Sequence, residues 1–409
     1  MTAARTVEAD LLPTAGRIRA ALAATDSYVH RNEFRGFDPY DALMSPLFRL
    51  PFLRSSHYVR LAAQQALKRL PVNVRPLLGI ERHASPVTFA WMLEGYAHLW
   101  ATDTDRRDYY GEQVEECLRA LAALRSPGYS GDCWGYEFDW EARYAKIRAG
   151  VPNIVVTGIV ANALFEAQRL VGSSSARDSC VRSTEFLLHD LGRTTATDGS
   201  FCWSYSPDDR QVVLNATMKG ARLCAQAYSL TGDVRLRDTA RQTVAFVVDH
   251  QRSDGAWPYA IGDARSWVDN FHTGYVLECL ESYERYARDD SFRSAKSQGW
   301  RYYRSRFLTK DYVPKYFDEK LYPTDATACA QTISTLCTFG DVEAAASVAS
   351  WTLSNMSRSD GAFIYQRHAL YKNRIPYLRW SVAPMFCALT RLLHAIEPSV
   401  TRNESGRSS

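Results

Sequence analysis

The sequence predicts an all-α fold, an (α/α)6 toroid in which six helical hairpins close into one barrel. Three observations indicate this: a similar turn recurs along the chain, strongly apolar helical runs follow these turns, and amphipathic helices separate the runs. Repeated units of this size cannot bury their apolar faces alone and must stack on their neighbours. We therefore expect one barrel to account for most of the 409 residues.

The recurring turn joins Gly, usually in an Asp-Gly pair, to alternating aromatic residues. Four segments share this pattern, and a fifth at 312–316 keeps only the aromatic residues; the four are 131–136, 198–205, 254–259 and 360–365. Asp and Gly are typical of turns. Each segment therefore predicts a loop that leads into a helix.

The helices between these loops alternate in character. The run that begins at Ile154 is apolar on nearly every side, which is typical of an interior helix, whereas 235–248 has one apolar stripe and a charged opposite face. Similar apolar runs begin near Val87, Ile154, Ala216, Phe271, Ala326 and Val382. We expect six inner helices with amphipathic helices outside them.

The connections at the two ends of the hairpins differ in length. At 231–233 and 339–341 a Gly that stops an inner helix is followed at once by an Asp suited to cap the next helix. These turns are short, so the long aromatic loops lie at the opposite rim, beside the N-termini of the inner helices. We expect any active site at that rim.

The alternation of short and long connections also predicts the domain organisation. Residues 1–55 are expected to form a helical extension that packs on the barrel, and residues 56–397 the toroid that carries the catalytic or binding site. The polar residues 398–409 are expected to be a disordered tail.

Composition excludes several classes of function. The formal net charge is +4 from 49 basic and 45 acidic residues, without a dense basic run, so nucleic acid is not an expected partner. No secretion signal or stretch of about 20 apolar residues is evident, which predicts a cytoplasmic protein without a transmembrane segment. The nine cysteines form no CxxC pair and no HxxxH motif occurs, so we predict no metal site and no cofactor.

Polar residues just before the inner helices should converge on one mouth. Asn and Asp at such positions are ordinary helix caps, which is the favoured interpretation of Asn153 and Asn215. The segment 266–274 contains more than a cap requires, because an acid, an amide and an imidazole fall within four residues; His272 is the foremost catalytic candidate, and a core histidine is the alternative. The converging set is Asn153, Asn215, Asp269, Asn270, His272, Asp325, Arg379 and Trp380.

The first aromatic loop suggests chemistry with carboxylates. Glu137 and Asp139 lie between Trp134 and Trp140, a composition that suits a sugar platform beside a general acid or base. Glycoside hydrolysis needs two carboxylates, which Glu137 or Asp139 could supply opposite Asp269 or Asp325. The alternative is that the two tryptophans only pack the loop against the barrel.

A second chemistry would use tyrosine or histidine to remove a proton beside a uronate carboxylate, with Arg or Asn neutralising the charge. Residues that recur in every repeat, however, more often hold the repeat together than react. The aromatic residues predicted to bind substrate at the rim are Tyr136, Trp203, Tyr205, Trp257, Tyr259, Tyr316 and Tyr365, with Tyr377 near them.

The recurrent turn resembles that of the (α/α)6-toroid superfamily of six-hairpin glycosidases, polysaccharide lyases, uronyl epimerases and terpenoid cyclases. More narrowly, 269–274, 316–318, 321–325 and 330–331 resemble uncharacterised bacterial proteins of exopolysaccharide and lipopolysaccharide biosynthesis. The resemblance implies a glycan or lipid-linked saccharide as substrate and peripheral association with a membrane synthesis complex.

Three hypotheses follow. The first is a carbohydrate-active enzyme of surface-polysaccharide biosynthesis that acts by acid/base chemistry, as a hydrolase, lyase or uronyl epimerase. The second is a toroid that binds glycan as a scaffold without catalysis. The third is an isoprenoid cyclase, which the absence of DxDD and DDxxD motifs disfavours and which would need an apolar cavity.

Overall fold

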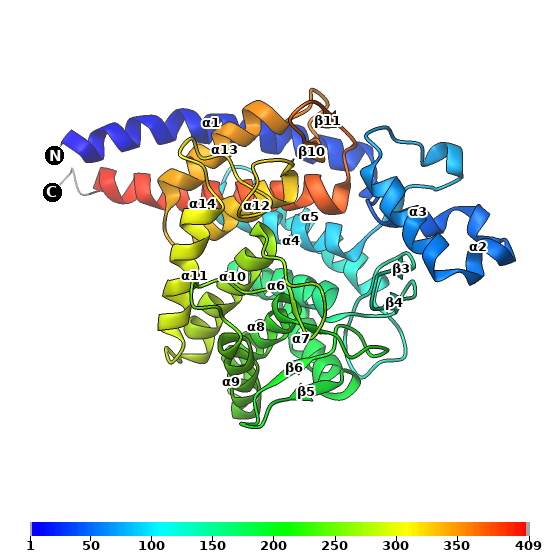
Figure 1. Cartoon of the computed structure of the whole chain (residues 1–409). Helices are drawn as coiled ribbons and strands as arrows, with labels where there is room; N and C mark the ends of the chain where they lie inside the picture. Colours follow the sequence, from blue (N-terminus) through cyan, green and yellow to red (C-terminus); the bar gives the residue numbers. More distant parts are fainter. Residues whose placement is uncertain (1, 406–409) are drawn as a thin grey trace.

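The computed structural model describes the backbone of residues 2–405 and the side chains of residues 12–397. Six helices form an inner ring in which each contacts the next and the last contacts the first (Figure 1). They are α4 (Pro86–Thr102), α6 (Ile154–Val171), α8 (Leu214–Thr231), α10 (Asn270–Ala287), α12 (Ala326–Thr338) and α14 (Ala383–Ser405). The closed ring confirms the predicted all-α (α/α)6 toroid.

The outer helices pack on the inner helices that precede them in the chain. Five do so directly: α5 (Arg107–Ala123), α7 (Ser174–Glu185), α9 (Val234–Asp249), α11 (Arg293–Arg306) and α13 (Val342–Met356). The remaining outer position, against α14, is filled by α1 (Thr2–Arg31), which runs beside α13 and α14 (Figure 1). The N-terminal helix therefore completes the ring, with Ile18, Leu22 and Val29 buried in the same core as the barrel.

The predicted division of the chain at residue 56 remains a prediction, and α1 lies on the N-terminal side of it. The predicted tail, 398–409, falls outside the residues whose side chains are described, and the backbone of α14 extends to Ser405.

The short turns form as the sequence predicts. Asp233 accepts a hydrogen bond from the Arg235 amide at 3.0 Å and Asp341 from that of Ala344 at 3.3 Å, so each caps its outer helix. Gly232 adopts φ +76°, a left-handed conformation that favours glycine and ends α8.

The aromatic turns join neighbouring repeats. The carbonyl of the tyrosine in one turn accepts a hydrogen bond from the first amide of the preceding inner helix, as Tyr205 does from Ile154 at 3.0 Å and Tyr259 from Leu214 at 3.1 Å. Tyr316 and Tyr365 repeat this bond with Asn270 and Ala326. The backbone at the recurring tyrosine therefore fixes each loop over the N-terminus of an inner helix.

Short antiparallel strands fasten the long loops at this rim. The pairs are β1 (Arg35–Gly36) with β2 (His83–Ala84), β3 (Trp140–Glu141) with β4 (Lys146–Ile147), β5 (Arg193–Thr195) with β6 (Phe201–Trp203), and β7 (Val212–Val213) with β8 (Ala260–Ile261). A three-stranded sheet places β10 (Gln366–Arg367) between β9 (Thr324–Asp325) and β11 (Lys372–Asn373).

The segment between α1 and α4 lies at the side of the ring. It contains two short 3-10 turns, η1 (Asp41–Met44) and η2 (Pro46–Arg49), then α2 (Pro51–Ser55), α3 (His57–Arg69) and a third turn, η3 (Pro76–Leu78). Figure 1 shows α2 and α3 projecting from the barrel beside the β3–β4 hairpin, and α3 contacts β3.

The barrel axis holds a polar network with one member from each inner helix. Arg391 of α14 pairs with Glu94 of α4 and with Glu278 of α10. Asn162 of α6 donates to Glu94 at 2.9 Å and accepts from Gln226 of α8 at 3.0 Å, while Gln331 of α12 donates to Glu278 at 2.5 Å. Because buried charges are stable only when paired, this network ties all six inner helices together.

One helix, α6, is long and apolar enough to cross a membrane by length and composition alone, but 67% of it is buried inside the structure. Its apolar surface is the inner wall of the ring. The nine cysteines are free thiols.

Candidate active site

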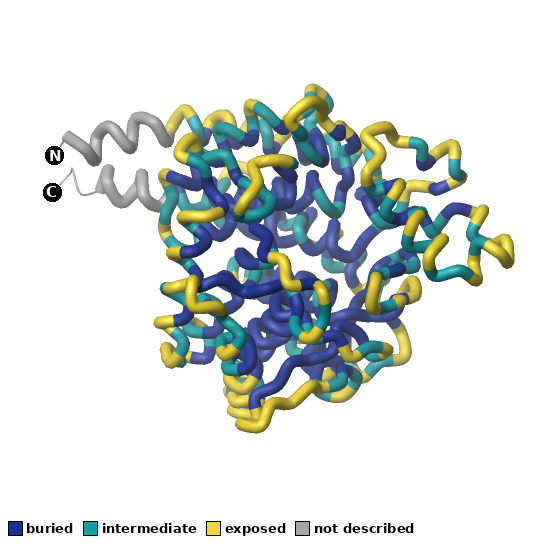
Figure 2. The backbone as a smooth tube through the Cα atoms, viewed as in Figure 1, coloured by how far each residue is buried: buried dark blue, intermediate teal, exposed yellow. Residues whose placement is uncertain are grey.

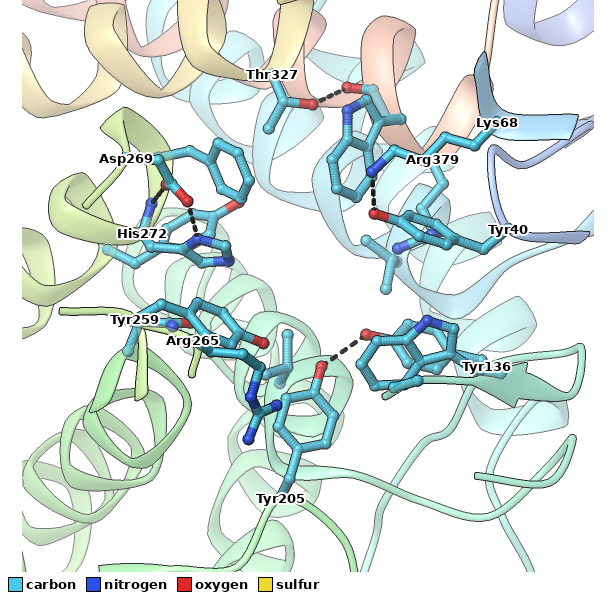
Figure 3. Close-up of a pocket in the computed structure, with 18 of the residues that line it drawn as sticks. Tyr40, Lys68, Tyr136, Tyr205, Tyr259, Arg265, Asp269, His272, Thr327 and Arg379 are labelled. Atoms are coloured by element: carbon cyan, nitrogen blue, oxygen red, sulfur yellow. Dashed lines mark hydrogen bonds and ion pairs between the residues drawn. The ribbon is translucent and has the colours of Figure 1, made fainter. Parts of the chain in front are cut away.

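A cavity of about 720 Å³ opens at the rim that carries the aromatic loops (Figure 3). Its walls come from the loops before the inner helices and from the first turns of those helices, with α3 closing one side. The cavity thus lies where the unequal connection lengths predict a site.

His272 is positioned in this cavity by Asp269. One carboxylate oxygen of Asp269 accepts from the backbone amide of His272 at 3.0 Å and so caps α10, while the other lies 2.7 Å from Nδ1 of the His272 ring. Trp267 also donates its indole N–H to Asp269, at 3.0 Å. The carboxylate is buried, the imidazole is 22% exposed, and its second ring nitrogen points into the cavity (Figure 3).

Aromatic rings line the wall beside His272. The Tyr259 ring stacks on Trp267 with centroids 4.8 Å apart and meets the His272 ring edge-on at 4.6 Å. Tyr205 and Tyr136 share a hydrogen bond of 3.0 Å between their hydroxyls. Burial raises the pKa of Tyr205 well above its usual value, so this pair stays protonated at neutral pH.

Two buried arginines contribute to the walls. Arg379 forms a bidentate pair with Asp38, with Nη2 2.8 Å from one carboxylate oxygen, and its guanidinium lies over the Tyr136 ring. Burial lowers the pKa of Arg379, but the charge of Asp38 and the hydrogen bonds to it outweigh burial and raise it above its usual value. Arg265 is fixed by Asp263 and by Gln211 at 2.6 Å. Both guanidiniums are rigidly held.

The mouth carries unpaired positive charge. Lys68, Arg69 and Arg143 line it, and no ion pair joins them to an acid among residues 12–397. Lys68 donates to the Tyr40 hydroxyl at 2.5 Å, and Arg69 and Arg143 are exposed. The two carboxylates among the lining residues are both engaged: Asp269 as above, and Glu141 with Arg60 at 2.6 Å and His57 at 2.5 Å.

The structure brings many of the predicted site residues together. Those that line the cavity are His272, Asp269, Tyr136, Trp140, Tyr205, Asn215, Tyr259, Tyr316, Arg379 and Trp380. Asn215 is not the cap expected of it, because Val213 holds the N-cap position of α8. The side-chain nitrogen of Asn215 is buried without a partner in the described structure.

Three predicted carboxylates lie outside the cavity lining. Glu137 pairs with His83 at 2.9 Å, and both of its oxygens are buried. Asp139 accepts from the Ala149 amide at 2.8 Å, within its own loop. Asp325 is fully buried, caps α12 through the Thr327 amide at 2.8 Å, and accepts from Gln366 at 2.8 Å. Burial raises the pKa of Asp325 to about 6, although these hydrogen bonds lower it.

The predicted tryptophans at 134, 203 and 257 pack against the helices of the ring. Trp134 donates its indole N–H to the Leu121 carbonyl of α5 at 2.8 Å, and Trp257 donates to Val247 of α9 at 3.0 Å. Trp203 packs over Gly220 of α8, where an added Cβ would meet its ring at 2.8 Å. Trp134, Trp203 and Trp257 therefore pack the loops against the helices and lie outside the cavity lining.

The other predicted residues also lie outside the cavity lining. Asn153 caps α6 by accepting from the Val156 amide at 2.9 Å. Asn270 bonds to Thr332 at 3.0 Å and to Tyr303 at 2.9 Å, between helices. Tyr365 is buried against Tyr377 with ring centroids 5.0 Å apart.

Comparison with known proteins gives relatives by structure only. No protein-family model matches the sequence, and no curated protein resembles it in sequence. An unsaturated glucuronyl hydrolase from Bacillus sp. GL1 aligns with a TM-score of 0.59 and 12% identity, over 92% of this chain and 95% of that one. A GH76 α-mannanase from Bacteroides thetaiotaomicron gives 0.58 and 12%, over 78% and 88%. A cellobiose 2-epimerase from Bacillus thermoamylovorans gives 0.58 and 11%, over 78% and 90%.

The chain has the fold of these enzymes. At 11–12% identity the likeness extends to the (α/α)6 toroid and no further.

Several lining residues had no signal in the sequence. Tyr40, Gln65 and Lys68 reach the cavity from the segment before α4, and Trp91 and Tyr275 from inner helices. Arg265 directly precedes the 266–274 motif and Trp267 lies within it, so both could have been found from that motif. The described residues contain no group of three or more His, Cys, Asp or Glu side chains placed to hold a metal ion.

Proposed function

We propose that this chain is a carbohydrate-active enzyme that removes a proton from a carbon of an acidic sugar unit, in an epimerase or lyase reaction. His272 is the acid/base group, Asp269 orients it, and the aromatic walls bind the sugar rings. The observation that carries the proposal is the buried Asp269 on one ring nitrogen of His272 while the other nitrogen faces the cavity (Figure 3).

The Asp269 contact fixes the tautomer of His272. A carboxylate 2.7 Å from Nδ1 accepts the proton there, which leaves Nε2 with a free lone pair toward the cavity. Such a nitrogen can take a proton from a sugar carbon next to a carbonyl or carboxylate group, and the negative charge then develops on the neighbouring oxygen. In epimerisation a second proton must reach the opposite face of that carbon, which a tyrosine hydroxyl of the wall can supply, and His272 later releases the proton that it took. In elimination the bond from the next carbon to its oxygen breaks, and the His272 imidazolium can give its proton to the departing oxygen.

The carboxylates argue against glycoside hydrolysis. That reaction needs two carboxyl groups, one of which carries a proton at neutral pH. Although burial raises the pKa of Glu141, the hydrogen bonds from Arg60 and His57 lower it below its usual value. Asp269 is committed to His272 and Trp267. Neither acid lining the cavity is suited to protonate a leaving group.

Charge at the mouth supports an acidic substrate. Lys68, Arg69 and Arg143 provide positive charge without a carboxylate partner in the described structure. The hydroxyls of Tyr136 and Tyr205 are neutral donors on the wall near Arg379. A uronate fits this combination, because the cations attract its carboxylate and the hydroxyls can stabilise charge on an oxygen.

Aromatic rings in a polar cavity support a sugar more than an isoprenoid. Tyr259, Trp140 and Trp380 can cover the apolar faces of pyranose rings, whereas the guanidiniums of Arg265 and Arg379 would be costly against a hydrocarbon. The structural neighbours named above act on saccharides, and one is described as an epimerase.

The motif resemblance supports a place in bacterial surface-polysaccharide biosynthesis, with a cytoplasmic location and a lipid-linked or free glycan as substrate. The alternative of a non-catalytic glycan-binding scaffold predicts the same aromatic walls without a use for the Asp269–His272 pair.

The test is incubation with uronate-containing oligosaccharides, free and lipid-linked, in deuterated water. Mass spectrometry follows the products of the wild type, of His272→Gln and of a matched control, His189→Gln, whose side chain is a surface histidine paired with Glu185. Deuterium incorporation without a change of bond order indicates epimerisation, and a new double bond indicates elimination. We expect one of these in the wild type and the control and neither in His272→Gln. Gain of water, or binding with no chemical change, would contradict the proposal.

A further inference from the structure

The segment from 42 to 80 differs in charge from the rest of the chain. It contains six basic residues and no Asp or Glu; the six are Arg49, Arg54, Arg60, Lys68, Arg69 and Arg75. Because the whole chain carries a net charge of +4, the residues outside this segment carry −2 together. All of the positive excess lies in 39 residues that build η2, α2, α3 and η3.

Some of these charges are used within the protein and others are not. Arg75 is buried and paired with Asp41 at 2.7 Å, and Arg60 is paired with Glu141. Arg49, Arg54 and Arg69 are exposed, and no acid pairs with them in the part of the chain whose side chains are described. The unpaired charges therefore face outward.

The same segment exposes large apolar side chains. Phe52 is 67% exposed, Tyr58 81% and Leu77 87%, with Leu47, Leu50 and Val72 also exposed. Neither η2 nor α2 has a buried residue. Figure 2 shows this projection as mostly exposed or intermediate, in contrast to the dark core of the ring. An apolar surface that the protein itself leaves uncovered usually marks an interaction site.

We propose that residues 46–72, around α2 and α3, form a docking surface for an anionic lipid bilayer. Leu47, Leu50 and Phe52 would enter the boundary between headgroups and acyl chains, while Arg49, Arg54 and Arg69 contact lipid phosphates. Interleaved apolar and basic side chains without any acid are the composition that binds a negatively charged membrane surface. A protein partner of ordinary composition would not require the complete absence of acids over this length.

The position of α3 connects this surface to the cavity. Leu61, Gln65, Lys68 and Arg69 line the cavity from one side of α3, whereas Tyr58, Ala62 and Ala66 are exposed. Docking would therefore place the mouth of the cavity at the lipid surface. A saccharide attached to a lipid could enter from the membrane, a consequence that rests on the proposed function, although the docking itself does not.

The test is flotation of the full chain with two kinds of vesicle. One contains phosphatidylcholine alone, and the other contains phosphatidylcholine with about 30% phosphatidylglycerol, which makes its surface negatively charged. Two variants alter the surface: Leu50→Ser/Phe52→Ser removes apolar anchors, and Arg49→Gln/Arg54→Gln removes charge. The matched control Arg119→Gln/Arg235→Gln removes the same charge from exposed positions on α5 and α9.

We expect the wild type and the control to float with anionic vesicles only, and less so as salt rises, because salt screens the attraction. Each surface variant should reduce the bound fraction at least about fivefold with an unchanged thermal melting curve, because none of the altered side chains is buried. Equal binding to neutral vesicles, no binding, or equal loss in the control would overturn the proposal. So would wild-type dimerisation that Leu50→Ser/Phe52→Ser abolishes, because a second copy would then be the occupant.

The docking proposal and the proposed function can fail independently of each other. His272→Gln should bind vesicles like the wild type, and both surface variants should keep activity on a soluble oligosaccharide, because Arg49, Leu50, Phe52 and Arg54 do not line the cavity.

Discussion

Among the histidines that lie beside carboxylates, His272 and His83 have opposite surroundings. His272 has one acid partner, Asp269, and faces the cavity with its second nitrogen. His83 lies between Glu137 at 2.9 Å and Asp41 at 3.7 Å, and its side chain is 12% exposed. Arg75 and Arg379 pair with Asp41 and Asp38 beside it. One histidine keeps a free nitrogen at an open site, and the other is enclosed by charge.

The surroundings of each histidine indicate its role better than the residue type does. Burial lowers the pKa of His83, but the hydrogen bonds to Asp41 and Glu137 outweigh burial and raise the pKa to about 9. This histidine is therefore an imidazolium at neutral pH. An imidazolium cannot act as a base. His83 joins Asp41, the residue after Tyr40, to Glu137 in the first aromatic loop. The His272 ring has a single acid to orient it and a face left for substrate.

The largest expected effect is on catalysis. His272→Gln should reduce the turnover of the sugar substrate by about 10³-fold, in the range of a lost general base, while the melting temperature stays close to that of the wild type. Glutamine can still donate to Asp269, so the local structure should persist. Steady-state kinetics and calorimetry on the same preparation measure both quantities. Turnover within tenfold of the wild type would place the reacting group elsewhere.

The opposite pattern is expected at the second histidine. His83→Gln should lower the free energy of unfolding by about 3 kcal/mol near pH 6, because it leaves the buried carboxylate of Glu137 without its cation, and should leave turnover of the folded enzyme within about threefold of the wild type.

The pH dependence of that loss follows from the raised pKa. Because the folded-state pKa of about 9 exceeds the unfolded value of 6.5, the stabilisation by His83 is complete below pH 6.5 and is lost as pH rises through 9. Denaturant unfolding at pH 6, 8 and 10 should show the two proteins converging. A difference that does not change with pH would contradict this assignment.

A buried lysine differs from His83 because no carboxylate is paired with it in the described structure. Lys219 of α8 is 1% exposed, lies 3.5 Å from the centroid of the Tyr275 ring, and has no ion pair among the described residues. Burial lowers its pKa to about 7. Lys219→Met should therefore stabilise the protein at pH 7 by on the order of 2 kcal/mol, because no charge then needs to be buried.

The sign of this effect with pH is opposite to that of His83. The unfolded chain takes up the Lys219 proton below 10.5 and the folded one only below about 7, so wild-type stability rises as pH increases from 7 to 10.5. The advantage of Lys219→Met should shrink over that interval. An unchanged or growing advantage would indicate that Lys219 is stabilised by a contact other than the Tyr275 ring.

The two histidines also show what the sequence could predict. Helical periodicity and the Gly-Asp turns determine the ring and its open rim, because they depend on neighbours in the chain. Asp269 and His272 were found because the cap and its first-turn partner are three residues apart. Glu137 was assigned to the cavity because its partner His83 lies more than fifty residues away, and no local pattern reveals that pair. Lys68 and Tyr40 were missed for the same reason, since only the folded chain brings α3 to the cavity.

The smallest expected effect tests whether carboxylates of the first aromatic loop take part in the reaction. Asp139 lies outside the cavity lining, and one of its oxygens accepts from the Ala149 amide at 2.8 Å. Asp139→Asn keeps an oxygen for that bond, so turnover should stay within about twofold of the wild type and stability within about 0.5 kcal/mol. A two-carboxylate hydrolase that used Asp139 would instead lose activity by orders of magnitude, because an amide can neither protonate a leaving group nor activate water. Measured beside His272→Gln on the same substrate, this variant distinguishes acid/base chemistry at His272 from chemistry that uses a carboxylate of the first aromatic loop.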